Sequence, residues 1–112
     1  MSLGTTIDAA VRGDVEVTFA VINEDTDPVE LRFRSGQTAD LAVYEDDTDG
    51  DPVWRWSDGR MFTMAVNTAR LDPGERLVQE FVWTDPPGGE YVAVATLEAD
   101  TSATATTTFT VA

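Results

Sequence analysis

Three residue types are missing from the sequence: cysteine, histidine and lysine. Without cysteine, the chain can form neither a disulfide nor a thiolate metal site. Without histidine and cysteine it lacks the usual pairs of nucleophile and general base, and no lysine is present to activate a serine. Carboxylate pairs are abundant, but a chain this acidic contains them by chance. The sequence therefore predicts a protein that is not an enzyme and uses no cofactor.

Long apolar runs are also missing. No stretch approaches the ~20 apolar residues that a membrane-spanning helix needs. Residues 2–6, which follow Met1, are too polar and too few for the apolar part of a secretory signal. The lack of cysteine fits a reducing compartment. We therefore expect a cytoplasmic protein, and its 112 residues suit one domain spanning 1–112.

Positive charge is scarce, since 21 acidic residues face 7 arginines and give a net charge of −14. The negative electrostatic field of such a chain repels phosphate backbones and anionic lipids, so we expect neither nucleic-acid nor membrane partners. An acidic surface without lysine indicates a halophilic protein, because high salt screens the self-repulsion of the carboxylates. The alternative is an acidic surface directed at a basic partner.

Apolar and polar residues alternate with a period of two through much of the chain, which is typical of half-buried β-strands. Residues 91–97 are almost continuously apolar and predict a central strand covered on both faces. Residues 62–71 have some helical spacing and could hold one short turn. No other helical pattern is present. The predicted strands are residues 7–11, 15–21, 29–34, 41–43, 54–56, 61–63, 77–83, 91–97 and 104–111.

Turn residues separate these strands. Arg12-Gly13 can close the first hairpin, and Asp58-Gly59 predicts a type I′ hairpin that pairs residues 54–56 with 61–63. Asp72-Pro73-Gly74-Glu75 fits a type II turn, with proline and glycine at its central positions. Short strands with a turn every 8–12 residues predict an all-β protein, namely an immunoglobulin-like antiparallel two-sheet β-sandwich.

The acidic stretch 45–51 has the composition of a calcium loop, Glu-Asp-Asp-Thr-Asp-Gly-Asp. An EF-hand loop begins with aspartate and ends with a bidentate glutamate at its twelfth position. Here the first residue is Glu45 and the twelfth is Trp56, so the match fails at both ends. We predict a solvated acidic turn and no metal site, with weak cation binding as the alternative.

Aromatic and arginine side chains concentrate in residues 54–62, Trp-Arg-Trp-Ser-Asp-Gly-Arg-Met-Phe. Trp54 and Trp56 share one face of their predicted strand, and Arg55 lies on the other. One interpretation is structural: the two tryptophans fill the core, and a carboxylate or Phe62 holds Arg55. The other is a recognition surface, because tryptophan and arginine are frequent anchors of protein interfaces. Both hold if the tryptophans are buried while the turn is presented.

The order of the predicted strands indicates how the loops divide between the two ends of a sandwich. If every connection reverses direction, loops 23–28, 46–52, 67–75 and 99–103 share one end. Loops 12–13, 35–38, 57–60 and 85–89 then share the other end, which is less acidic. A binding site for an acidic partner is therefore expected at that second end.

The same segments resemble a known family. Phe-Arg-Ser-Gly-Gln at 33–37, Val-Tyr at 43–44, the run 53–62, Leu-Asp-Pro-Gly-Glu at 71–75 and Gly-Glu-Tyr at 89–91 occur in order. This series resembles the bacterial and archaeal intracellular proteinase inhibitor family known as BsuPI, from about residue 15 to 97. The Trp-Arg-Trp-Ser-Asp-Gly string is its most specific part. Tyr91 also resembles the tyrosine corner of immunoglobulin-like folds.

The resemblance implies an immunoglobulin-like sandwich that inhibits an intracellular, subtilisin-like serine protease through a presented loop. The alternative is a non-inhibitory module that binds another protein. We expect the partner-binding residues to lie in two presented elements supported by Trp54 and Trp56. The predicted site consists of Ser35, Gly36, Gln37, Trp54, Arg55, Trp56, Ser57, Asp58, Gly59 and Arg60.

Overall fold

The computed structural model describes residues 2–45, 48 and 50–112, and this part of the chain contains strands and no helix. Every strand pairing within it is antiparallel. The strands are β1 (Leu3–Arg12), β2 (Asp14–Asn23), β3 (Val29–Phe33), β4 (Ala39–Glu45), β5 (Trp54–Arg55), β6 (Asn67–Leu71), β7 (Arg76–Trp83), β8 (Gly89–Leu97) and β9 (Thr104–Val111). The predicted all-β class is confirmed.

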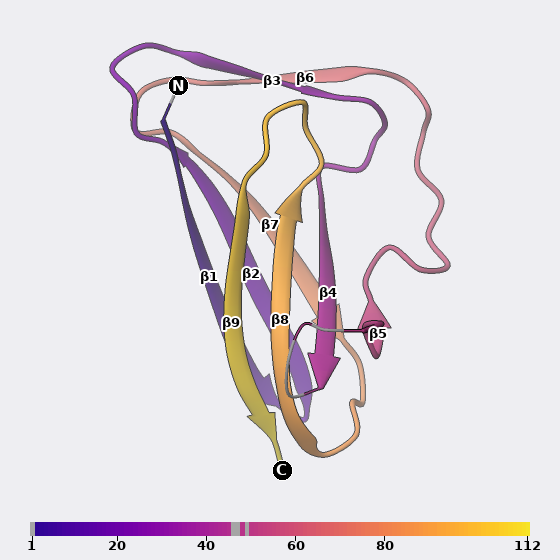
Figure 1. Cartoon of the computed structure of the whole chain (residues 1–112). Coiled ribbons are helices and arrows are strands. Elements are labelled where there is room, and N and C mark those ends of the chain that lie inside the picture. Colours follow the sequence, from indigo (N-terminus) through magenta and orange to yellow (C-terminus); the bar gives the residue numbers. More distant parts are fainter. Residues whose placement is uncertain (1, 46–47, 49) are drawn as a thin grey trace.

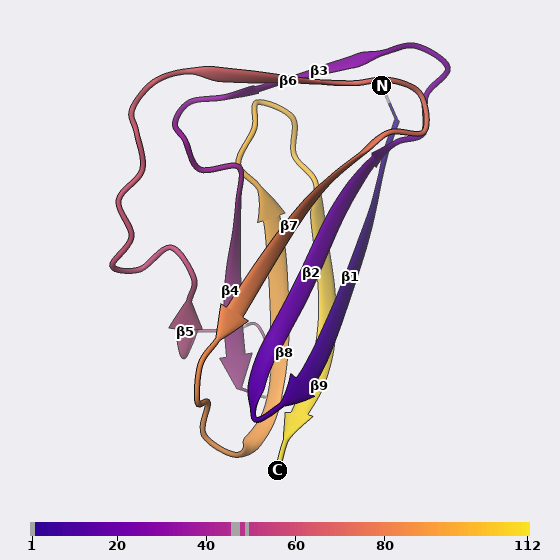
Figure 2. The ribbon, with the colours of Figure 1, turned by 180° about the vertical axis from the view of Figure 1, so that it is seen from behind.

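Two sheets form the layers of a β-sandwich. One has the strand order β1-β2-β7 and the other β5-β4-β8-β9 (Figure 1). The remaining strands, β3 and β6, pair with each other as a separate two-stranded ribbon that runs across one end of the sandwich (Figure 2). The sequence predicted two sheets, so this ribbon is an addition to the predicted architecture. The immunoglobulin-like topology stays a prediction.

The core lies between the layers and is filled by every second residue of the strands. In β2 the alternation of exposed and buried positions begins at Asp14, and Val15, Val17 and Phe19 are almost fully buried. Strand β8 contributes small residues to the core, Ala93 and Ala95, which are fully buried. Its other face is only half-buried. The prediction that β8 is covered on both faces is therefore wrong, although β8 does lie between two strands.

The ribbon is tied to the sandwich by one buried polar side chain. Asn23, at the end of β2, is 1% exposed. Its Nδ2 donates to the carbonyl oxygens of Asp27 and Leu71, both at 2.9 Å. Its own carbonyl accepts the N–H of Gly74 at 2.8 Å. Because the side-chain bonds reach the loop just before β3 and the last residue of β6, Asn23 ties both ends of the ribbon to β2 at one point.

Two predicted turns are present. The N–H of Glu75 donates to the carbonyl of Asp72 at 2.9 Å, and Gly74 has a φ of 81°. A type II turn needs such a positive φ at its third position, so the prediction is confirmed. Gly13 closes the β1–β2 hairpin with a φ of 89°.

The Tyr91 hydroxyl donates to the Pro87 carbonyl at 2.7 Å, which is the contact that a tyrosine corner makes.

Residues 62–71 contain no helical turn. Their second half is strand β6, whose register places Ala69 opposite Leu31 and Leu71 opposite Val29. The helical spacing was misleading because Ala69 and Leu71 face the core with the period of a strand. The predicted strand 61–63 is also wrong, since these residues form an irregular segment.

The predicted division of loops between the two ends is wrong as well. The N–H of Glu98 donates to the carbonyl of Thr38, and that of Asp100 to the carbonyl of Arg32, both at 2.9 Å. Residues 35–38 therefore lie beside the β8–β9 connection, at the end opposite the β1–β2 hairpin (Figure 1). Strands β3 and β6 cause this difference, because they cross the end of the sandwich instead of running along it.

Candidate protein-binding site

Strand β5 pairs with β4 and not with residues 61–63. Trp54 lies opposite Val43 and Arg55 opposite Ala42. The N–H of Trp56 extends this pairing by donating to the Leu41 carbonyl at 2.9 Å. The predicted Asp58-Gly59 hairpin is therefore wrong, and Trp56 does not face Met61.

Two successive turns follow β5. The N–H of Asp58 donates to the Arg55 carbonyl, and the N–H of Arg60 to the Ser57 carbonyl, both at 3.1 Å. Gly59 has a φ of 77°, whereas Asp58 does not have a positive φ. A type I′ turn needs a positive φ at both central residues. The chain consequently leaves the sheet here and continues as the irregular segment 60–66, which stands out beside the sandwich (Figure 1).

Both predicted tryptophans pack on the core. The rings of Trp54 and Trp83 are stacked, with centroids 5.5 Å apart and planes at 18°. Trp56 meets Phe81 edge to face at 5.1 Å. Both tryptophans are half-buried, so each also presents part of its ring outside the core. The structural interpretation therefore holds in part, because the two side chains pack against the core but do not fill it.

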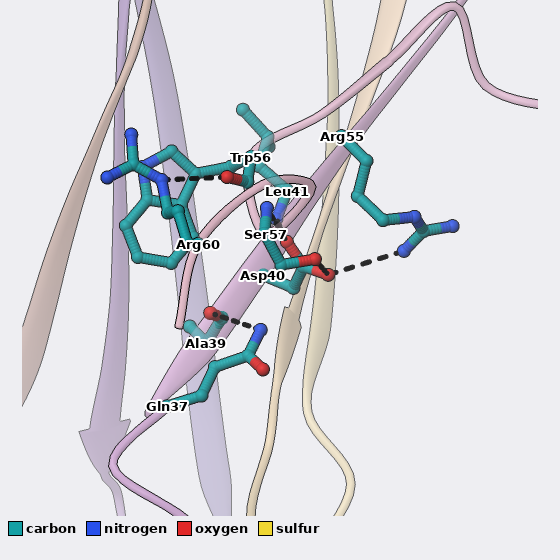
Figure 3. Close-up of polar contacts among 8 residues, drawn as sticks. All are labelled: Gln37, Ala39, Asp40, Leu41, Arg55, Trp56, Ser57 and Arg60. Atoms are coloured by element: carbon teal, nitrogen blue, oxygen red, sulfur yellow. Dashed lines mark hydrogen bonds and ion pairs between the residues drawn. The ribbon is translucent and has the colours of Figure 1, made fainter. Parts of the chain in front are cut away.

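Trp56 also forms the base of the irregular segment. The guanidinium carbon of Arg60 lies 4.3 Å from the centre of a Trp56 ring, and its Nε donates to the Trp56 carbonyl at 2.8 Å (Figure 3). Phe62 contacts the same indole, with ring centroids 5.8 Å apart. A cation–π contact and an aromatic pair thus hold two residues of the segment on a side chain that is itself fixed by the core.

A buried carboxylate, Asp40, connects the start of β4 to the turns after β5. Its Oδ1 accepts the backbone N–H groups of Leu41 at 2.9 Å and Ser57 at 3.1 Å. Its Oδ2 accepts the Ser57 hydroxyl at 2.7 Å and pairs with Arg55 Nη1 at 3.3 Å (Figure 3). Arg55 is therefore held by a carboxylate, one of the two predicted arrangements. Sequence reasoning missed Asp40, although an aspartate inside the apolar stretch 39–43 was a usable signal.

Glu98 lies near this carboxylate on the outer face of the four-stranded sheet. Glu98 is solvent-exposed, but partial desolvation in the folded state raises its pKa, and the negative charge of Asp40 raises it further. The positive charge of Arg55 acts in the opposite direction. Asp40 and Glu98 thus compete for one arginine, and Asp40 holds the hydrogen-bonded position.

Residues 35–37 hold the irregular segment through a backbone hydrogen bond. The N–H of Gly36 donates to the Thr63 carbonyl at 2.8 Å. A Cβ atom at Gly36 would lie 2.6 Å from Thr63 Oγ1, so this close approach favours glycine. Gln37 is fixed by its Nε2, which donates to the Ala39 carbonyl at 3.3 Å (Figure 3). The structure therefore brings the two predicted elements, 35–37 and 57–60, to the same end of β4.

The most exposed apolar side chains of this surface were not predicted as site residues. Met61 is 98% exposed, Met64 87% and Val66 53%. They follow the predicted residues 57–60 directly. Their signal in the sequence was a pair of methionines outside any clear alternation, in a stretch without acidic residues.

Charge distinguishes this surface from the rest of the chain. Residues 31–39 and 59–71 contain no aspartate or glutamate, and they carry four of the seven arginines: Arg32, Arg34, Arg60 and Arg70. The two stretches lie side by side, because β3 pairs with β6 and Gly36 bonds to Thr63. Glu98 and Asp100 border this face, because they line one hollow with Arg34 and Ser35, and Asp72 pairs with Arg70 at 3.1 Å. We call residues 31–39 and 59–71 the acid-free face.

The acidic stretch 45–51 includes residues 46, 47 and 49, which lie outside the described residues, so the predicted solvated turn stays a prediction. Within the described part of the chain, no group of three or more histidine, cysteine or acidic residues could hold a metal ion. No helix long and apolar enough to cross a membrane occurs among those residues.

The chain matches the family model BsuPI, intracellular proteinase inhibitor, over residues 4–102. This match covers most of the 112 residues, so the chain belongs to the BsuPI family of intracellular proteinase inhibitors. The resemblance carried by the Trp-Arg-Trp-Ser-Asp-Gly string is thereby confirmed. No curated protein matches the chain in sequence.

Proposed function

We propose that this protein inhibits a cytoplasmic, subtilisin-like serine protease by placing a surface segment of the acid-free face in the cleft of the enzyme. One observation carries the proposal: the longest stretch without acidic residues in a chain of net charge −14 also presents two methionines to solvent. The family, whose members are described as intracellular proteinase inhibitors, supports the same function. In this function the whole chain, residues 1–112, acts as one binding domain and performs no catalysis.

The binding mode follows from how the segment is held. A peptide in a protease cleft lies extended and forms main-chain hydrogen bonds, in the manner of an added strand. Ordering a free loop for this purpose costs about 0.5–1.5 kcal/mol per immobilised side chain. Here Arg60 and Phe62 already rest on Trp56, and Thr63 is bonded to Gly36. Much of the ordering cost is therefore met when the inhibitor folds.

The charge distribution supports an acidic partner. We infer that the protein and its target both function in high salt. At 1 M salt the repulsion between charges on two acidic surfaces is screened beyond a distance of ~3 Å. Contact between two acidic proteins still brings carboxylates within that distance. The acid-free face lowers this repulsion at the contact and supplies Arg60 to an acidic rim, while Arg34 lies beside Glu98 and Asp100.

The test is a titration of the full chain into a halophilic subtilisin-like protease in molar salt, with peptide hydrolysis as the readout. We expect hydrolysis to stop at stoichiometric amounts of micromolar inhibitor, and the inhibitor to survive the incubation. Heat-unfolded chain serves as the control and should be digested without inhibiting. Lack of inhibition at micromolar concentration, together with rapid digestion of the folded chain, would refute the proposal. Recovery of only non-protease partners from a high-salt lysate would instead favour a non-inhibitory binding module.

A further inference from the structure

We propose that Met64 fills the primary specificity pocket of the target protease and that Met61 occupies a second apolar pocket beside it. The peptide bond between Met64 and Ala65 then lies at the catalytic serine. This inference rests on the proposed function and names the reactive bond within the acid-free face. It also identifies the target as a protease whose primary pocket accepts a long, unbranched apolar side chain.

The backbone is held on both sides of Met64. Before it, the Thr63 carbonyl accepts the Gly36 N–H at 2.8 Å. After it, Asn67 Nδ2 donates to the Ala65 carbonyl at 3.3 Å and to the Ser35 carbonyl at 3.4 Å. Ser35 and Gly36 thus support the two residues that flank Met64, while its own side chain is 87% exposed. A reactive site needs this combination of a fixed main chain and a free side chain.

Met61 is more exposed than Met64, yet its position suits a secondary contact. Its two neighbours, Arg60 and Phe62, both rest on Trp56. A protease must enclose the main chain on each side of the bond it attacks, and Trp56 occupies that space around Met61. Around Met64 the neighbours Thr63 and Ala65 are exposed. Three residues of extended chain span about 10 Å, so the two methionines can reach separate pockets of one cleft.

The chemistry of methionine suits this role. Its unbranched thioether side chain adapts to apolar pockets of irregular shape. Buried in a protease pocket, such a side chain gains the full hydrophobic transfer energy that it lacks in the free inhibitor. The segment also has no carboxylate that the pocket would have to desolvate, because residues 59–71 contain no acidic residue.

The same contacts explain why the bond would be cut slowly. The catalytic serine attacks the Met64 carbonyl and passes its proton to the protease histidine. The bond to the Ala65 nitrogen then breaks, and the amine leaves with that proton. Here the amine stays close, because Asn67 holds the Ala65 carbonyl and β6 remains paired with β3. The amine can therefore attack the acyl-enzyme again before water hydrolyses it, which re-forms the Met64–Ala65 bond.

The experiment compares Met64→Lys with wild type against two enzymes in molar salt: a halophilic subtilisin-like protease and a trypsin-like protease. The trypsin-like pocket carries an aspartate and prefers a basic residue. We expect Met64→Lys to weaken inhibition of the first enzyme by about 100-fold or more and to create inhibition of the second. Met61→Ala should weaken inhibition about 10-fold. Val82→Lys, at a 44% exposed position on the opposite layer, is the matched control and should change neither.

Mass spectrometry after prolonged incubation with catalytic amounts of the subtilisin-like protease locates the bond. The expected product gains one water and is cut only between Met64 and Ala65, with the two pieces still associated. If wild type inhibits but Met64→Lys does not change selectivity, or if the cut lies elsewhere, this inference is wrong and the proposed function stands. If wild type does not inhibit the protease at all, both are wrong. Thermal unfolding of each variant shows whether its fold is intact.

Discussion

Replacing Asp40 with alanine tests whether the base of the binding segment depends on a buried carboxylate. The change removes the acceptor for the N–H groups of Leu41 and Ser57 and for the Ser57 hydroxyl. A buried donor left without a partner costs about 1–3 kcal/mol. The ion pair with Arg55 adds at most about 1 kcal/mol, because the arginine side chain is 39% exposed. We therefore expect Asp40→Ala to lower the free energy of unfolding by about 3–5 kcal/mol.

Asp72→Ala is the matched control for this prediction. Asp72 also pairs with an arginine, at 3.1 Å, but both side chains are more than 60% exposed. Asp72→Ala should lower the free energy of unfolding by less than about 1 kcal/mol. In molar salt, which screens an exposed ion pair, it should lower this free energy by almost nothing. The Asp40 effect should persist in salt because it comes from hydrogen bonds. Urea unfolding of both variants at low and at molar salt measures the difference. Equal costs for the two variants would refute the role assigned to Asp40.

Other contacts give separate predictions. The raised pKa of Glu98 means that the folded state holds this proton more tightly than the unfolded chain. Its contribution to stability is therefore complete below the ordinary pKa of 4.5 and is lost as the pH rises through the higher folded value. Glu98→Gln should remove this loss, so the unfolding free energies of the two proteins should diverge as the pH rises from 4.5 through the folded pKa and then keep a constant difference; pH profiles that stay parallel through that range would contradict the assignment. Tyr91→Phe should lower the free energy of unfolding by about 0.5–1.5 kcal/mol, because the Pro87 carbonyl loses its donor. An unchanged urea midpoint would show that this bond contributes nothing. Asn67→Ala should leave inhibition by fresh protein within about 3-fold, because the Thr63–Gly36 bond before Met64 remains, while the loss of the bonds to the Ala65 and Ser35 carbonyls lets the inhibitor be cut at least about 10-fold faster. Weaker initial binding without faster cutting would contradict this role.

The parts of the fold that the sequence predicts are those with local signals. Alternation in β2 and β3 is imposed by one buried face, and it can be read without knowing the partner strand. The type II turn at Asp72 to Glu75 is equally local, because proline and glycine set its dihedral angles themselves.

The missed parts depend on contacts between distant residues. The Asp58-Gly59 signal favours a hairpin, yet Asp40 binds the Ser57 N–H and hydroxyl, and Leu41 binds the Trp56 N–H. These bonds direct the chain along β4 instead of back on itself. Short strand β6 was missed because its partner β3 lies far away in sequence.

The candidate site shows the same limit. The sequence identified Trp54 to Arg60 through rare residues in a fixed string, and these residues do form the base of the exposed segment. It did not identify Met61 and Met64, because an apolar residue near a predicted strand is normally interpreted as core. Only the exposure of their side chains distinguishes them from core residues.

The β3–β6 ribbon has a consequence for the order in which the molecule becomes active. Hairpins β1–β2 and β8–β9 join neighbouring segments, whereas the ribbon joins strands separated by β4 and β5. Closing such a long loop costs chain entropy before any contact compensates for it, so the ribbon should form after these two hairpins. Until it forms, Ser35 and Gly36 cannot support Thr63 and Ala65. A newly made chain would therefore be a substrate of the protease first and its inhibitor only after β3 and β6 have paired.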